Sequence, residues 1–220
     1  LADSPLAAQY LIALAAPGEY RLVFGGWSTR STLPLFGSVR SATQMISYEL
    51  ALGLSLVTVF LMSGTMSTSG IVEAQSGLWN CVTLFPAVCV YIVSMFGETN
   101  RLPFDLPEAE GELVAGHTTE YSSMKFAWYY LSEYINMLNV SMIATTMFLG
   151  GWRAGPIVTW IYSLWGGDPN VGWITMLWFF IKTWCFMFIM IWTRGTLLRM
   201  RYDHFMQLGW KILIPVALGW

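Results

Sequence analysis

One charge-dense stretch divides this sequence: Gly97-Glu-Thr-Asn-Arg-Leu-Pro-Phe-Asp-Leu-Pro-Glu-Ala-Glu-Gly-Glu-Leu-Val-Ala-Gly-His-Thr-Thr-Glu-Tyr-Ser-Ser-Met-Lys125. Within it, only Arg101 and Lys125 are basic, whereas six of the thirteen acidic residues of the chain fall there: Glu98, Asp105, Glu108, Glu110, Glu112 and Glu120. So many carboxylates repel one another unless some are protonated or reach cations on neighbouring loops. A solvated acidic loop is the simplest interpretation of such a charge run.

The segments on both sides of this stretch are strongly apolar. The chain is 55% hydrophobic, 16% aromatic and only 11% charged, whereas a soluble domain is about 25% charged. This composition predicts an all-α fold, a polytopic transmembrane helix bundle with an ordered polar loop on the matrix or cytoplasmic side. We expect a single membrane domain over residues 1–220, with spanning helices at 42–66, 78–96, 125–150 and 173–193 and partial helices at 6–27 and 210–220.

Two segments near the N-terminus do not fit this pattern of spanning helices. The apolar run at 6–16 is interrupted by Pro17-Gly18 and has eleven residues, fewer than the ~20 that a spanning helix needs. It therefore predicts a kinked helix or the end of a longer one. Residues 28–41 are expected to form a polar loop that leads into the first spanning helix.

The basic residues give the orientation. Counting alternate loops, nine of the eleven lysines and arginines fall on one side, Arg153 lies opposite and Lys182 lies within a span. The positive-inside rule assigns the nine to the cytoplasm or mitochondrial matrix. The acidic stretch shares that side, where Pro103 and Pro107 restrict its backbone, so we expect an ordered loop with paired charges.

Three ionisable residues are expected inside the bilayer: Glu49, Glu133 and Lys182. Burying one costs at least about 2.5–3.5 kcal/mol, so each is a candidate functional residue. The alternatives are snorkelling to the interface for Glu49 and a structural ion pair with a carboxylate for Lys182. Glu133, Asn136 and Asn139 follow helical spacing and should share an inward face.

The sequence offers no cofactor site of its own. Its three cysteines have no C-x-x-C spacing and its two histidines are far apart, so iron–sulfur, haem and zinc sites are not predicted. It also lacks a glycine-rich nucleotide fingerprint. Hydride and electron chemistry would therefore begin on another chain.

Several motifs resemble subunit 1 of respiratory complex I, the NADH:quinone oxidoreductase, and its bacterial counterpart. They are Gly26-Trp-Ser28, Arg40-Ser-Ala-Thr-Gln-Met-Ile-Ser-Tyr-Glu49, Glu98-Thr-Asn-Arg-x-Pro-Phe-Asp-Leu-x-Glu-x-Glu-x-Glu112, Glu120-Tyr-Ser-Ser-Met-Lys-Phe-Ala, Glu133-Tyr134, Arg194-Gly-Thr-x-x-Arg-Met-Arg-Tyr-Asp203 and Gly209-Trp-Lys211. The resemblance covers nearly the whole chain and departs at His117-Thr-Thr119 and Gly111. The family has eight spanning helices, and this chain corresponds to part of the third through the beginning of the eighth.

The resemblance implies a core membrane subunit without independent activity, acting within a proton-translocating NADH:ubiquinone reductase. It would form the membrane wall of the quinone tunnel and the start of the proton-coupling path, with ubiquinone as substrate and FMN and iron–sulfur clusters on partner subunits. The tunnel and loop residues would be Arg40, Glu98, Arg101, Asp105, Glu108, Glu110, Glu112 and Tyr134. The proton-coupling path would be Glu49, Glu120, Glu133 and Lys182, and a basic cluster would comprise Arg194, Arg199, Arg201 and Asp203.

The expected partners are other membrane subunits of the complex, peripheral iron–sulfur and quinone-site subunits, lipid, and a separate chain that supplies the family's N-terminal third, but no nucleic acid. We favour the mitochondrial inner membrane, with the bacterial plasma membrane as the alternative. Two other functions stay open: a stand-alone ion or proton antiporter that uses the intramembrane Glu and Lys residues, and a pure scaffold. For the arginine cluster, binding of anionic lipid headgroups is an alternative to a functional role.

Overall fold

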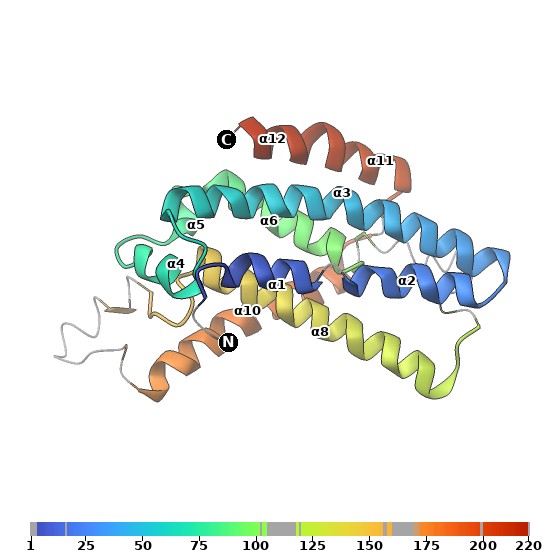
Figure 1. The fold of residues 1–220 in the computed structure, drawn as a ribbon, viewed down its shortest axis with the longest axis horizontal. Coiled ribbons are helices and arrows are strands. Elements are labelled where there is room, and N and C mark those ends of the chain that lie inside the picture. The colour runs from blue at the N-terminus through green and yellow to red at the C-terminus, as the bar shows by residue number, and fades with distance from the viewer. Residues whose placement is uncertain are drawn as a thin grey trace.

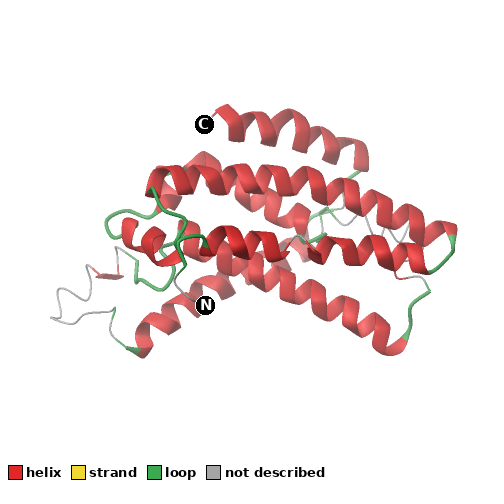
Figure 2. Ribbon diagram, viewed as in Figure 1, coloured by secondary structure: helices red, strands yellow, loops and turns green. Residues whose placement is uncertain are grey.

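A computed structural model describes residues 4–15, 17–101, 103–104, 118, 120–155, 158–159, 170, 172–198 and 200–219 of the chain. Within these residues the regular structure is helical throughout, without a strand, which confirms the predicted all-α bundle (Figure 2). Two of the described helices, Thr32–Ser63 and Trp173–Thr196, are long and apolar enough to cross a membrane, and Phe85–Glu98 is a shorter apolar helix.

The bundle is built around α3 (Thr32–Ser63), which packs along α6 (Phe85–Glu98) on one side and α2 (Pro17–Ser28) on another (Figure 1). Small side chains allow the close approach to α2: a Cβ added to Gly26 would lie 2.7 Å from the carbonyl oxygen of Pro34. The contact between α3 and α6 buries Tyr48, Leu56 and Met95 completely. These three elements therefore form the most extensively packed part of the described fold.

The first apolar segment is described as two helices, and Ala16 between them lies outside the described residues. α1 (Ala7–Ala15) ends just before Pro17, and α2 begins at that proline. Proline is well suited to the first position of a helix, because its missing N–H would have no intrahelical acceptor there. The two short helices follow one another along the bundle (Figure 1).

Two helix boundaries differ from the sequence expectation. α3 begins at Thr32, ten residues earlier than expected, so most of the predicted polar loop at 28–41 is helical. Pro34 is tolerated because it lies in the first turn, where backbone N–H groups have no intrahelical partner. The helix expected at 78–96 is divided into α5 (Asn80–Thr83) and α6, with the break at Leu84, two residues before Pro86.

α8 (Ser123–Phe148) and α10 (Trp173–Thr196) begin and end within three residues of the expected positions. They meet near the C-terminal half of α8 and diverge from there (Figure 1). Thr145 and Thr183 lie at this crossing, with 3.4 Å between their hydroxyl oxygens. A short helix, α4 (Thr68–Ala74), also packs on α8 near the same end.

The C-terminal segment runs along the outside of α3 as α11 (Tyr202–Leu208), the π-helical turn η2 (Gly209–Leu213) and α12 (Ile214–Gly219). Tyr48 of α3 holds this segment against the bundle. Its ring stacks on that of Phe205 with 4.3 Å between centroids, and its hydroxyl donates a hydrogen bond to the Phe205 carbonyl. π-helical turns are rare and often occur beside functional sites.

Candidate functional site

A cavity of about 370 Å³ lies inside the bundle between α1, α3, α6, α8 and α10. Two carboxylates line it, Glu49 of α3 and Glu98 of α6, together with the amides of Asn136 and Asn139 on α8. The remaining wall is mainly apolar, and the fully buried Tyr91 belongs to it. The cavity follows α8 for ten residues, from Asn136 to Thr146, hence about 15 Å at 1.5 Å per residue.

An ion pair borders the cavity at the end of α6. Arg101 Nε lies 2.9 Å from Glu133 Oε1, and the two side chains are 6% and 20% exposed. The guanidinium of Arg101 also lies over the ring of Tyr134, 4.5 Å from its centroid. Glu133 precedes the lining residue Asn136 by about one turn of α8, and Arg101 follows the lining residue Glu98 by three residues, just beyond the end of α6.

The turn that carries Arg101 is fastened by an amide on α3. Gln44 is fully buried, and its Nε2 donates hydrogen bonds to the carbonyl oxygens of Gly97 at 2.8 Å and Phe104 at 2.9 Å. These acceptors stand on either side of Arg101, so a single side chain joins the end of α6 to the start of the acidic stretch. Gly97 allows the approach, because a Cβ there would lie 2.5 Å from Cδ1 of Tyr48.

Lys182 of α10 is buried at the opposite end of α8. Its ammonium donates hydrogen bonds to the carbonyl oxygens of Leu149 at 2.6 Å, Gly151 at 3.1 Å and Arg153 at 2.6 Å. It also lies 4.8 Å from the centroid of the Trp79 ring. A cation at this position suits the partial negative charge of a helix C-terminus. Among the described residues, its partners are therefore carbonyl oxygens and an aromatic ring, and the carboxylate partner considered as the alternative is not one of them.

Gln75 strengthens the same end of α8. Its Nε2 donates to the carbonyl oxygens of Thr146 and Met147, and its Oε1 accepts from the Gly150 N–H at 2.9 Å. Asn80 Nδ2 donates to the Met147 carbonyl as well. The last carbonyls of a helix have no intrahelical donor. α8 therefore ends in a network supplied by α4, α5 and α10.

The other predicted site residues lie nearer the surface. Glu120 is exposed and borders a hollow at the start of α8, and Arg40 is half-buried on α3. In the basic cluster, Arg194 is exposed, whereas Arg201 and Asp203 form an ion pair of 3.1 Å with side chains 78% and 60% exposed. Exposed pairs of this kind stabilise proteins by about 0–1 kcal/mol.

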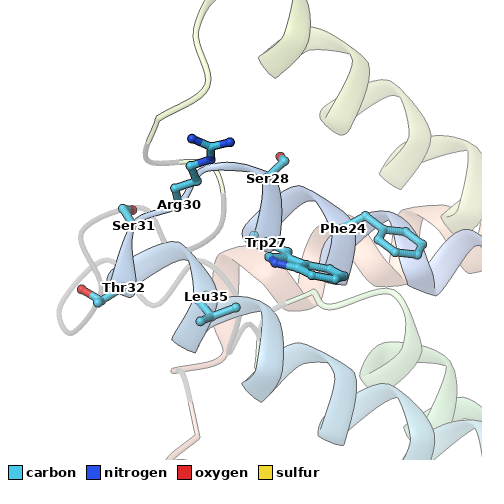
Figure 3. Close-up of a pocket in the computed structure, with 8 residues that line it drawn as sticks. Phe24, Trp27, Ser28, Arg30, Ser31, Thr32 and Leu35 are labelled. Atoms are coloured by element: carbon cyan, nitrogen blue, oxygen red, sulfur yellow. The ribbon is translucent and has the colours of Figure 1, made fainter.

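The α2–α3 turn forms a second, open hollow of about 600 Å³ (Figure 3). Its described lining includes Trp27, Arg30 and Leu35 and none of the site residues predicted from the sequence. Arg30 extends outward from the turn, away from Leu35, and has a φ of 57°, which few non-glycine residues adopt. Tyr121 fastens the turn from the far side, donating a hydrogen bond to the Gly25 carbonyl at 2.8 Å.

Five predicted site residues lie outside the part of the chain that the structure describes: Asp105, Glu108, Glu110, Glu112 and Arg199. The expected ordered loop with paired charges stays a prediction for that reason, and so do the roles of all the site residues. At the edge of the described part, the Met200 N–H donates to the Pro103 carbonyl at 3.0 Å. This contact joins the start of the acidic stretch to the segment that follows α10.

The sequence model of the NADH dehydrogenase family matches residues 1–220. The chain belongs to the NADH dehydrogenase family. It is 58% identical over 220 residues to the H subunit of the NADH-quinone oxidoreductase of Frankia alni, and 58% identical over 222 residues to the corresponding protein of Frankia casuarinae. Each alignment covers 100% of this chain and 47% of the relative, so the chain spans about half the length of the curated relatives it matches.

In this NADH dehydrogenase family chain, three polar residues near the site could not be recognised from the sequence. Gln44, Gln75 and Asn80 were not singled out, because an amide in an apolar helix gives no sign of which backbone groups it will meet. The acceptors of Gln44 lie 53 and 60 residues away in the chain. The only available signal was that a buried amide needs hydrogen-bond partners.

Proposed function

We propose that this chain is part of the membrane subunit of a proton-translocating NADH–quinone oxidoreductase, where it lines the quinone tunnel and begins the proton-coupling path. The single observation that carries the proposal is the line of ionisable groups formed by the Arg101–Glu133 pair, Glu98 and Glu49. It leads from the acidic stretch into a cavity between apolar helices. Membership of the NADH dehydrogenase family and the names of the Frankia relatives support the same function.

The coupling mechanism follows from the chemistry of quinone reduction. Conversion of a quinone to a quinol takes up two protons, and the transient negative charge attracts cations and repels carboxylates nearby. Arg101 is well suited to respond, because its guanidinium stays protonated and it can shift between Glu133 and the acids of the stretch. When Arg101 moves away, Glu133 becomes easier to protonate. Glu98 and Glu49 would then take up or pass on protons along the cavity.

The quinone, the electrons and the partner subunits follow from the same proposal. Arg40, Asp105, Glu108, Glu110, Glu112 and Tyr134 would face the quinone tunnel, and the electrons would arrive from FMN and iron–sulfur clusters on partner subunits. Arg194, Arg199, Arg201 and Asp203 would close that face. Because the relatives named above come from Frankia, we favour the bacterial plasma membrane over the mitochondrial inner membrane. The separate polypeptide expected for the N-terminal third stays a prediction.

Substitution of the ion pair tests the proposal. In Glu133→Gln the side chain keeps its size and hydrogen-bonding capacity but cannot ionise, so we expect protons pumped per electron to fall while the assembled complex stays abundant. Glu73→Gln serves as the matched control, because Glu73 is an exposed carboxylate on α4. Unchanged pumping by fully assembled Glu133→Gln enzyme would refute the role of this pair in coupling.

A double-mutant cycle separates coupling from support of the fold. If the Arg101–Glu133 pair is only structural, each single Gln variant loses assembled complex, because a buried charge left without its partner costs about 3–5 kcal/mol. The double variant Arg101→Gln/Glu133→Gln would then recover assembly and activity together. If the pair serves coupling, the double variant assembles but still pumps poorly.

An ion antiporter is the second candidate, favoured by a specific observation. The cavity with its two carboxylates is lined by the C-terminal end of α1, next to the proline that is expected to kink the first apolar segment, and transporter sites are commonly built beside broken helices. A stand-alone antiporter would exchange cations in vesicles without NADH or quinone. Cation flux that depends on Glu49 in the absence of electron transfer would favour this candidate.

A further inference from the structure

The cavity between α1 and α8 has an unusual charge composition for a membrane interior. Its described lining residues include Glu49 and Glu98 but no lysine, arginine or histidine. Arg101 contacts Glu133, and Lys182 contacts the carbonyls after α8, so neither of these buried cations belongs to the lining. The Glu49 carboxylate therefore attracts a cation that enters the cavity, and the low dielectric of its surroundings strengthens that attraction.

The shape and the wall of the cavity restrict the kind of occupant. Its volume of about 370 Å³ lies within the range of about 300–1,000 Å³ that small-molecule sites occupy. It is elongated along α8, and its apolar wall includes Leu11, Leu52, Ile143 and Phe179 from four different helices. Such a wall suits a linear apolar chain better than a compact polar solute.

The wall carries carboxylates and amides as well as the hydroxyls of Thr68, Tyr91 and Thr146, and the last two already donate hydrogen bonds to backbone carbonyls of α8. Glu49, Asn136 and Asn139 supply carboxylate and amide oxygens, which accept hydrogen bonds from a protonated amine. Farther along α8, Met142 and Ile143 supply apolar surface. A molecule with an ammonium at one end and an alkyl chain at the other would meet suitable groups along its whole length.

We propose that this cavity is a binding site for linear primary alkylamines in their protonated form. The ammonium contacts Glu49 and the amide oxygens of Asn136 and Asn139, and the alkyl chain extends toward Phe179. A neutral alcohol of the same length gains the apolar contacts but not the ion pair. Occupancy by an amine displaces water from the carboxylates of the cavity, so bound amine also blocks proton movement through it.

Photolabelling tests the proposal in the membrane-embedded complex. The probes are decylamine and decanol, each carrying a diazirine near the end of its alkyl chain, and the labelled peptides are identified by mass spectrometry. We expect the amine to label the peptides containing Ile143 and Phe179, with about tenfold less labelling in Glu49→Gln. Labelling by the alcohol should be weaker and insensitive to that substitution. Glu73→Gln, an exposed carboxylate outside the cavity, should leave both patterns unchanged.

A second variant covers the case in which Glu49→Gln fails to assemble. Asn139→Leu keeps both carboxylates and removes one of the proposed amide contacts, so it should lower amine labelling and leave alcohol labelling intact. Equal labelling by amine and alcohol in the unaltered protein would overturn the proposal, as would amine labelling confined to the lipid-facing surface of α10. The readout is independent of NADH oxidation, so a failed coupling mechanism would not mimic a failed binding site.

Discussion

Replacement of Lys182 by Met discriminates between two roles for this buried cation. The ammonium donates three hydrogen bonds to the carbonyls of Leu149, Gly151 and Arg153, which lie just beyond the C-terminus of α8. The methionine side chain fills similar space but donates nothing. The variant therefore removes the charge and all three hydrogen bonds while leaving the apolar contacts of α10 largely intact.

The magnitude follows from these contacts. A hydrogen bond to a charged group contributes about 1.5–3 kcal/mol, and part of this gain offsets the cost of burying the ammonium. We therefore expect a net loss of about 3 kcal/mol for opening of this end of α8, which is roughly a hundredfold in the equilibrium.

Hydrogen exchange of the assembled complex measures this opening. Amides of residues 145–153 should exchange about a hundred times faster in Lys182→Met, and those near Glu133 should change little, since Leu149 follows Glu133 by about 24 Å along the helix axis. Lys125→Met is the matched control, because Lys125 is exposed in the first turn of α8. Pumping per electron by the assembled enzyme should remain close to normal.

The opposite result would refute this reasoning. If Lys182 carries protons, as the sequence analysis predicted, pumping collapses in Lys182→Met while exchange at residues 145–153 stays unchanged. The ammonium would then be part of the path and its carbonyl contacts incidental. If both stability and pumping are lost, the hydrogen bonds from Lys182 to the carbonyls after α8 are confirmed as stabilising. Pumping must then be compared at equal amounts of folded enzyme.

Two further predictions concern the turn around Arg101. Gln44→Leu should lower the free energy of unfolding by about 2–6 kcal/mol, because two buried carbonyl oxygens lose their donor at about 1–3 kcal/mol each. Thermal unfolding in detergent measures the loss, with the exposed Gln207→Leu as control, and an unchanged midpoint would contradict the proposed role of Gln44. Gly97→Ala should cost about 1–3 kcal/mol through overpacking against the buried Tyr48 ring. Gly53→Ala on α3, whose added Cβ meets no atom within 4 Å, should instead be neutral or stabilising; equal effects of the two substitutions would argue against a steric origin.

Hydropathy and helix-breaking residues predicted most of the bundle. α8 and α10 occur where apolar runs of sufficient length predicted them. The early start of α3 could not be found in this way. Arg40 and the polar residues near it argue against a membrane environment but not against a helix, and hydropathy cannot distinguish the two when a helix extends beyond the bilayer.

The charged residues of the candidate site could be predicted from the sequence, but the groups that they contact could not. Burial cost alone selected Glu49, Glu133 and Lys182, and all three make contacts inside the bundle or line its cavity. That Glu133 would face Arg101 did not follow from spacing, because the residues lie on different elements. The partners of Lys182 are backbone carbonyls. Every residue has one, so the residue types in the sequence do not show which carbonyls Lys182 will contact.

The distribution of polar side chains in this bundle follows from the scarcity of water around it. Helix ends leave carbonyl oxygens that must find donors, and a carboxylate cannot supply one when ionised. The described side-chain donors at these ends are accordingly uncharged or cationic: Gln44 and the Thr99 hydroxyl at the end of α6, and Gln75, Asn80 and Lys182 at the end of α8. Carboxylates contribute nothing to that requirement, and burying them is costly. Their presence along the cavity at Glu49 and Glu98 therefore calls for a reason other than the closing of helix ends, and proton or cation binding supplies one.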